Sequence, residues 1–344
     1  MRFAICDLRL RVAITVALMG AWVIAGCASK TQQRVKVGQK LDRRGDEIMV
    51  CGQLFHTGAP VVLWTDPGGY DAYRTERRFA PMTQSSYSAT TQQVKDISSP
   101  NRYGLRQSVL TTQQAEQVRG GGWPLELLQE KVDQFVIHYD VCGTAAQCFY
   151  ILHDRRDLSV HFMLDIDGTI YQTLDLKERA WHATTANSRS VGVEIANIGA
   201  YSAGSRDDPL EQWYPHDASG KRRIALPIYV KKGNLAPDFV GRPIRDEVVV
   251  GEIQGRKLRM YDLTPQQYDS LTKLTATLCK VFPKLKCDYP KDEHGQLIIH
   301  KLPKDQLDAY QGVLGHYHVD LQKTDPGPAF QWDRVINGAR ALSK

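Results

Sequence analysis

Two short apolar runs limit the fold of this 344-residue chain more than any other feature. Residues 135–139 read FVIHY and residues 191–195 read VGVEI. Apolar runs with β-branched members are typical of strands buried in a sheet, and the second run carries one carboxylate, Glu194. Amphipathic helices are predicted around them, at 123–133 and at about 329–341. Strands that alternate with such helices predict an α/β domain over 123–344.

The predicted domain also contains a hairpin and one well-marked helix. The hairpin covers residues 160–174, with Asp167 and Gly168 as its turn dipeptide. The helix begins after Thr264, which can cap it, and Pro265 suits the first helical position. Apolar residues then recur at helical spacing, a pattern that is typical of core packing rather than of a cofactor site.

The N-terminus has the pattern of a secretory signal peptide. Basic residues precede an apolar run at 12–25, which is too short to span a membrane comfortably. The tetrad IAGC that ends at Cys27 resembles the bacterial lipobox, so we expect a signal peptide over 1–26 and lipid on Cys27. If the organism is Gram-negative, Ala28 indicates the outer membrane, facing the periplasm. The alternative is an ordinary cleaved signal with a chance cysteine.

Composition shifts divide the rest of the chain. We expect residues 27–122 to form a polar tether and an N-terminal extension, with a small β-rich part at 47–81 and a linker at 82–108. Residues 199–258 are expected to be an insertion within the domain at 123–344. A loop of this size is usually functional or locally structured, so it either flanks a substrate groove or is a surface excursion.

Five cysteines remain once Cys6 and Cys27 are set aside: Cys51, Cys142, Cys148, Cys279 and Cys287. An oxidising compartment allows disulfides. We expect the two local pairs, which are six and eight residues apart, to be bonded and Cys51 to be left over. The alternative is that some of these residues are buried thiols.

Metal-competent side chains follow the ends of apolar runs. His138 ends the run at 135–139, His316 follows an apolar segment, and Asp325 lies in the next loop. Two neutral imidazoles and one carboxylate would leave an open position on tetrahedral zinc, which is a catalytic arrangement. His318 is a rival ligand, because in an extended segment it would share a face with His316. Spacing alone indicates this site only weakly.

The surrounding sequence words are more specific. In chain order they are FVIHY (135–139), VHFML (160–164), DGTIYQ (167–172), RAWHA (179–183), SVGVEI (190–195), GH (315–316) and KTDPGPAF (323–330). Together they resemble the type 2 N-acetylmuramoyl-L-alanine amidase family, which shares its fold with phage lysozyme-type amidases and peptidoglycan recognition proteins. The resemblance covers roughly half of the chain. It implies a mixed central β-sheet flanked by helices, with an N-terminal extension and an insertion.

The resemblance also implies roles for single residues. His138, His316 and Asp325 match the ligands of a catalytic Zn²⁺. Glu194 matches the carboxylate that acts as general base, and Lys323 matches the cation that supports the developing oxyanion. Such a site would hydrolyse the amide between N-acetylmuramic acid and L-alanine.

The resemblance to this family includes two further matches, and the sequence departs from the family pattern at one point. His182 matches a residue at the rim of the site that contacts substrate. Cys142 and Cys148 lie where peptidoglycan recognition proteins carry a disulfide. The loop from His316 to Asp325 is one residue shorter than in the bacterial amidases, so the rivalry with His318 stays open.

The expected partners are peptidoglycan or muropeptides, and a membrane through the lipid anchor. The net charge of +6 is modest and spread out, which does not indicate nucleic acid. One alternative function is a peptidoglycan-binding lipoprotein of the same fold that lacks catalysis. A more distant one is a structural lipoprotein that links envelope and wall.

Overall fold

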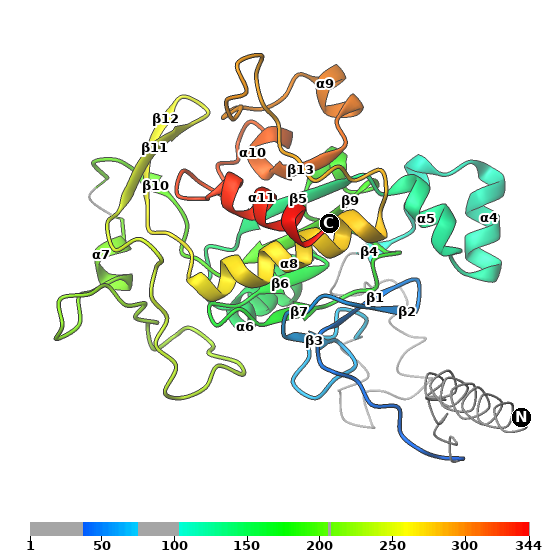
Figure 1. The fold of residues 1–344 in the computed structure, drawn as a ribbon, viewed down its shortest axis with the longest axis horizontal. Helices are drawn as coiled ribbons and strands as arrows, with labels where there is room; N and C mark the ends of the chain where they lie inside the picture. Colours follow the sequence, from blue (N-terminus) through cyan, green and yellow to red (C-terminus); the bar gives the residue numbers. More distant parts are fainter. Residues whose placement is uncertain (1–36, 75–102, 206–207, 344) are drawn as a thin grey trace, which may run out of the picture. The chain divides into compact units, whose positions relative to one another are not determined.

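The computed structural model describes residues 37–74, 103–205 and 208–343 (Figure 1). The chain divides into two compact units, Met1–Asp42 and Arg43–Lys344. Only the second unit is substantially described, and the account below concerns that unit.

Several sequence predictions lie outside the described residues. They are the signal peptide over 1–26, lipidation at Cys27, and most of the linker at 82–108. In the part of the chain that is described, no helix combines the length and the apolar character needed to cross a bilayer.

A six-stranded sheet forms the centre of the fold, in the order β13-β5-β9-β6-β7-β3 (Figure 1). Its strands are β3 (Val61–Leu63), β5 (Gln134–Tyr139), β6 (Phe162–Leu164), β7 (Ile170–Gln172), β9 (Ser190–Ile195) and β13 (Gly312–Gly315). Strands β13, β5, β9 and β6 are parallel neighbours, whereas β7 runs antiparallel to β6. The predicted mixed α/β sheet is confirmed.

The register of the parallel strands brings the predicted site residues to one edge. His138 on β5 lies opposite Glu194 on β9, and Gly315 at the end of β13 lies opposite Ile137. His316 follows β13 directly. Polar groups at the carboxyl ends of adjacent parallel strands meet at the same edge of a sheet, where open α/β sheets bind their ligands.

One face of the sheet packs against α8 (Pro265–Val281) and α11 (Trp332–Leu342), which also pack on each other. The capping box of Thr264 is present as predicted. Leu271 and Leu278 of α8 are fully buried in the main core, and burial of a leucine contributes about 1.5–3 kcal/mol. This helix anchors the sheet from the side that the site does not use.

The opposite face carries two smaller apolar clusters. One joins α6 (Ala145–Phe149) and the π-helical turn η4 (Tyr150–Arg155) to Met163 of β6. The other joins Val136 of β5 and Leu314 of β13 to residues of the short helices η5 (Thr184–Ala186), α9 (Lys304–Ala309) and α10 (His316–Val319). Because side chains alternate along a strand, His138 points to the same face as Val136, and the site opens on this side.

The remaining elements surround this core. The strands are β1 (Glu47–Val50), β2 (Gln53–His56), β4 (Tyr103–Gly104), β8 (Arg179–Ala180), β10 (Tyr201–Ser202), β11 (Val249–Ile253) and β12 (Arg256–Met260). The helices are η3 (Gln107–Val109), α4 (Thr112–Gly121), α5 (Leu125–Lys131), η5 (Thr184–Ala186), α7 (Leu210–Trp213), α9 (Lys304–Ala309) and α10 (His316–Val319).

The β-rich part of the N-terminal extension contributes a strand to the central sheet. The β1–β2 hairpin forms locally, but β3 pairs in parallel with β7 and becomes the edge strand of the central sheet. Ile48 and Val50 of β1 are buried in the main core. The physical reason is that β7 would otherwise expose a row of unpaired backbone groups.

The insertion at 199–258 has a small core of its own. Leu210 and Trp213 of α7 pack with Tyr214 and with Tyr261 at the end of β12. Strands β10, β12 and β11 form a three-stranded antiparallel sheet beside it. The insertion is therefore locally structured.

All five described cysteines are free thiols. The sulfur atoms of Cys142 and Cys148 lie within 4.8 Å of each other, and Cys279 and Cys287 are also neighbours. The structure thus brings the expected partners together, and the disulfide bonds themselves stay predictions.

Candidate active site

Three ligand-type atoms converge at the carboxyl edge of the sheet. Nδ1 of His138 lies 3.0 Å from Nδ1 of His316 and 2.9 Å from Oδ2 of Asp325, and the His316 and Asp325 atoms are 3.0 Å apart. All three residues are buried. We call this group the ligand triad.

The ligand triad fits a small divalent cation. Three lone-pair atoms face one another, and a cation can satisfy all of them at once. Zinc bonds of about 2.0–2.1 Å give a tetrahedral edge of about 3.3 Å, a few tenths longer than the observed separations. Two imidazoles and one carboxylate are also a donor set that leaves a fourth position open.

The loop that carries Asp325 is held from two sides. The hydroxyls of Tyr139 and Thr324 are 2.6 Å apart, which ties the loop to the end of β5. The side-chain amide of Gln254, at the tip of the β11–β12 hairpin, donates to the carbonyls of Asp320 at 2.9 Å and Lys323 at 3.0 Å. The position of the third ligand therefore depends on contacts from distant parts of the sequence.

His318 turns away from the ligand triad. Its Nδ1 accepts the backbone N–H of Gly315 at 2.9 Å, and its Nε2 donates to the carbonyl of Ile298 at 2.7 Å. The chain forms the short helix α10 at this point, so His316 and His318 do not share a face as they would in a strand. The geometry places His316, not His318, with His138 and Asp325.

A cavity of about 250 Å³ opens onto the ligand triad. Glu194, Lys323 and His182 line it, together with Trp181 and Arg156. No described residue of 199–258 is in this lining. The insertion instead supports the loop that carries Lys323 through Gln254.

Burial sets the protonation of these groups. It lowers the pKa of His138 to about 4, with the neighbouring His316 adding to the effect. Burial alone would raise the pKa of Asp325, but contacts with His316 and His138 outweigh it and hold that pKa far below its usual range. A neutral imidazole beside an ionised carboxylate is the state that binds a metal ion.

The pKa of Glu194 is shifted in the opposite direction, upward. Burial, reinforced by the charges of Asp325 and Asp140, raises its pKa well above the ordinary value, and Lys323 partly opposes this rise. Its Oε2 is buried and lacks a hydrogen-bond partner among the described residues. A carboxylate with a raised pKa is a better proton acceptor near neutrality.

His182 lines the cavity, but both of its ring nitrogens are engaged within the protein. Nδ1 lies 3.0 Å from Nε2 of His138, and Nε2 lies 3.2 Å from Oγ of Ser190. Contact with substrate stays a prediction, and the observed contact is with a residue of the ligand triad.

Arg106 is a residue that the sequence analysis missed. It lies in the segment expected to be a linker, yet it is fully buried. Its guanidinium donates to the carbonyls of Leu176 at 2.9 Å, Ser188 at 3.1 Å and Ser190 at 3.0 Å. A lone arginine in a polar stretch has no pattern that could have predicted this role.

Comparison with known families assigns the chain. The sequence model of the family described as N-acetylmuramoyl-L-alanine amidase matches residues 128–328, more than half of the chain. The chain belongs to the N-acetylmuramoyl-L-alanine amidase family. The match spans β5, β9, β13 and every residue of the ligand triad.

Membership of this amidase family confirms the resemblance drawn from the sequence. The protein is an N-acetylmuramoyl-L-alanine amidase, which hydrolyses an amide bond of peptidoglycan. The complete ligand triad with Glu194 beside it favours this enzyme over a binding module without catalysis.

Solved structures of amidases are also similar to the chain. A selenomethionine derivative of AmpD is 17% identical, with a TM-score of 0.31, and the match covers 70% of this chain and 90% of that one. AmiD from E. coli, in complex with an anhydro-N-acetylmuramic acid peptide, is 17% identical with a TM-score of 0.34, over 60% and 57% of the two chains. The endolysin LysCS from Clostridium intestinale is 17% identical with a TM-score of 0.31, over 63% and 88%. No curated protein matches the chain.

Proposed function

We propose that the protein is a zinc-dependent amidase that cuts between the lactyl group of N-acetylmuramic acid and L-alanine, in peptidoglycan or its fragments, during cell-wall turnover or remodelling. The observation that carries the proposal is the buried ligand triad beside Glu194, at the carboxyl edge of three parallel strands.

In this proposal His138, His316 and Asp325 hold the metal. Zinc bound there would supply a Lewis acid for the scissile carbonyl and would acidify a water at its open position. Burial favours the neutral ring of His138, and contacts with the two histidines favour the ionised carboxylate of Asp325, which is the state in which each can bind a metal ion.

Glu194 and Lys323 supply the remaining chemistry. Glu194 accepts a proton from the attacking water as the new C–O bond forms, and returns it to the nitrogen of L-alanine as the C–N bond breaks. The Lys323 ammonium stabilises the negative charge that develops on the carbonyl oxygen, an effect worth several kcal/mol in a site that excludes water.

The proposal includes a membrane anchor and a division of the chain. Residues 1–26 are removed as a signal peptide, Cys27 carries lipid, residues 27–122 form the tether and extension, and 123–344 form the amidase domain. The enzyme would then work outside the cytoplasm, anchored to a membrane; in a Gram-negative organism this would be the outer membrane, facing the periplasm. An acylated N-terminal peptide that begins at Cys27, found by mass spectrometry of membrane fractions, would support the anchor. An unmodified Cys27 in that fraction would contradict it.

A digestion experiment tests the activity. Purified protein incubated with peptidoglycan should release free stem peptides, detected by mass spectrometry. A chelator should abolish the release and added Zn²⁺ should restore it. Unchanged muropeptides after incubation with zinc-loaded protein would contradict the proposal.

A further inference from the structure

A line of hydrogen-bond contacts leads from the ligand triad into the body of the sheet. Nε2 of His138 lies 3.0 Å from Nδ1 of His182, and Nε2 of His182 lies 3.2 Å from Oγ of Ser190. The rings of His138 and His182 meet edge to face, at an interplanar angle of 82°. Ser190 begins β9, two strand positions before Gly192 and four before Glu194.

With a metal ion on the ligand triad, these contacts would determine where the protons lie. The Nδ1 atom of His138 faces the other two triad atoms, so it must be unprotonated to act as a ligand. The ring proton of His138 then lies on Nε2 and is donated to Nδ1 of His182. His182 in turn carries its proton on Nε2 and donates it to the Ser190 hydroxyl. A metal-binding histidine is commonly oriented in this way by a partner on its other nitrogen.

The protein is built to receive the ring of His182. A Cβ atom added at Gly192 would lie 2.4 Å from Nδ1 of His182, so only glycine leaves room for the ring against β9. The Asn187 side chain accepts the backbone N–H groups of His182 at 3.0 Å and Ala183 at 2.6 Å. Arg106 donates to the carbonyl of Ser190 and so fixes the far end of the line.

The two histidines of the ligand triad differ in whether their Nε2 atom has a hydrogen-bond partner. Nε2 of His316 is buried without a hydrogen-bond partner in the described part of the chain. Of these two histidines, His138 alone has a hydrogen-bond partner on its Nε2 among the described residues.

We propose that His182 is a positioning residue of the metal site: it holds His138 in the tautomer and ring orientation that leave Nδ1 free to ligate. The inference rests on the proposed zinc site, because it assigns a role in metal binding.

Zinc affinity tests the inference without reference to turnover. Full-length protein would be titrated with Zn²⁺ against a chromogenic chelator, for the wild type, His182→Phe, His182→Asn and Ser190→Ala. Phenylalanine keeps a ring but cannot accept the His138 proton, and loss of such a partner weakens metal binding about 10- to 100-fold. The Oδ1 of asparagine can take the place of Nδ1, so His182→Asn should recover much of the affinity. Ser190→Ala should give a smaller loss than His182→Phe.

The melting temperature of the zinc-free proteins provides the control for folding. Unchanged zinc affinity in a folded His182→Phe protein would overturn the inference, and so would equal losses for phenylalanine and asparagine. If His182→Phe does not fold, the other two variants decide. The inference would be overturned if Ser190→Ala bound zinc as tightly as the wild type and His182→Asn still lost the full 10- to 100-fold in zinc affinity. A wild-type protein that binds no zinc would instead contradict the proposed function.

Discussion

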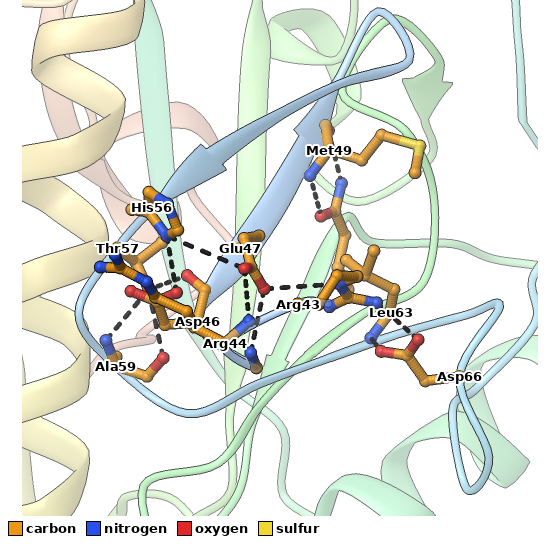
Figure 2. A network of polar contacts seen from close by, with 12 residues as sticks. Arg43, Arg44, Asp46, Glu47, Met49, His56, Thr57, Ala59, Leu63 and Asp66 are labelled. Atoms are coloured by element: carbon orange, nitrogen blue, oxygen red, sulfur yellow. Dashed lines mark hydrogen bonds and ion pairs between the residues drawn. The ribbon is translucent and has the colours of Figure 1, made fainter. Parts of the chain in front are cut away.

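Two clusters in the described part of the protein each bring one or more histidines and carboxylates within 4.8 Å of one another, yet their surroundings differ. The first is the ligand triad at the carboxyl edge of the sheet. The second consists of Asp46, Glu47 and His56, at the open end of the β1–β2 hairpin, where Glu47 pairs with His56 (Figure 2). The ligand triad is wholly buried, whereas His56 is exposed.

The carboxylates of the hairpin cluster already have donors. Glu47 accepts the backbone N–H groups of Arg44 at 2.7 Å and Gly45 at 3.0 Å, and Asp46 accepts that of Gly58 at 3.0 Å (Figure 2). In the ligand triad, Oδ2 of Asp325 instead faces the Nδ1 atoms of His138 and His316. Composition alone therefore does not make a metal site, because a cation must find acceptors that the protein has not already satisfied.

Removal of one ligand should separate the two clusters most sharply. His138→Ala should lose bound zinc and amidase activity, because two remaining ligands hold zinc weakly. His56→Ala is the matched control and should keep both. Metal content per chain and release of stem peptides are the measurements. Equal zinc content in the two variants would move the metal site away from the ligand triad.

Replacement of the carboxylate beside the triad should leave the metal and remove the chemistry. Glu194→Gln keeps the shape of the side chain but cannot accept a proton. Turnover should fall by about 100- to 10,000-fold, the usual contribution of a general base, with unchanged zinc content. Activity near the wild-type level would assign the base to another group.

Substitution of His318 should reduce stability rather than zinc binding. His318→Ala leaves the buried N–H of Gly315 and the carbonyl of Ile298 without partners, so stability should fall by about 2–4 kcal/mol. Zinc should still bind to the folded protein at low temperature. Chemical denaturation gives the free energy of unfolding, and loss of zinc equal to that in His316→Ala would reverse the ligand assignment.

Substitution within the hairpin cluster should change stability modestly and leave zinc binding and activity unchanged. Burial opposes ionisation of Glu47, but the N–H groups of Arg44 and Gly45 prevail and lower its pKa from 4.5 to about 2. A lowered carboxylate pKa stabilises the fold above pH 4.5, and the contribution is lost as pH falls toward 2. Glu47→Gln should cost about 1–2 kcal/mol at pH 7. The difference from wild type should shrink in denaturation curves at pH 3, and a constant difference would contradict this account.

The sequence predicted the elements whose patterns are local. The strands at 135–139 and 191–195 and the helix after Thr264 follow from apolar runs and a capping box, and all three are confirmed. Convergence of His138 with His316 could be expected from strand ends, since parallel strands share an edge.

Residues that act across long separations could not be predicted in this way. Arg106 reaches Ser190 and Gln254 reaches Lys323, and neither residue belongs to a periodic pattern or a short motif. The motif RAWHA identified His182 as a residue of interest, but it did not predict that the side chain points toward His138. That direction depends on the space at Gly192, which is a property of the folded sheet.

Gln254 joins the tip of the β11–β12 hairpin to the loop that carries Lys323 and Asp325, two segments that are far apart in the sequence. We expect an ion bound at the ligand triad to stabilise this loop and, through Gln254, the tip of the hairpin. Such a linkage is reciprocal, so stabilisation of the tip would raise the affinity for the ion by the same factor. Amide hydrogen exchange in this hairpin should slow when Zn²⁺ is added, so an insertion none of whose described residues lines the cavity can still report on its occupancy.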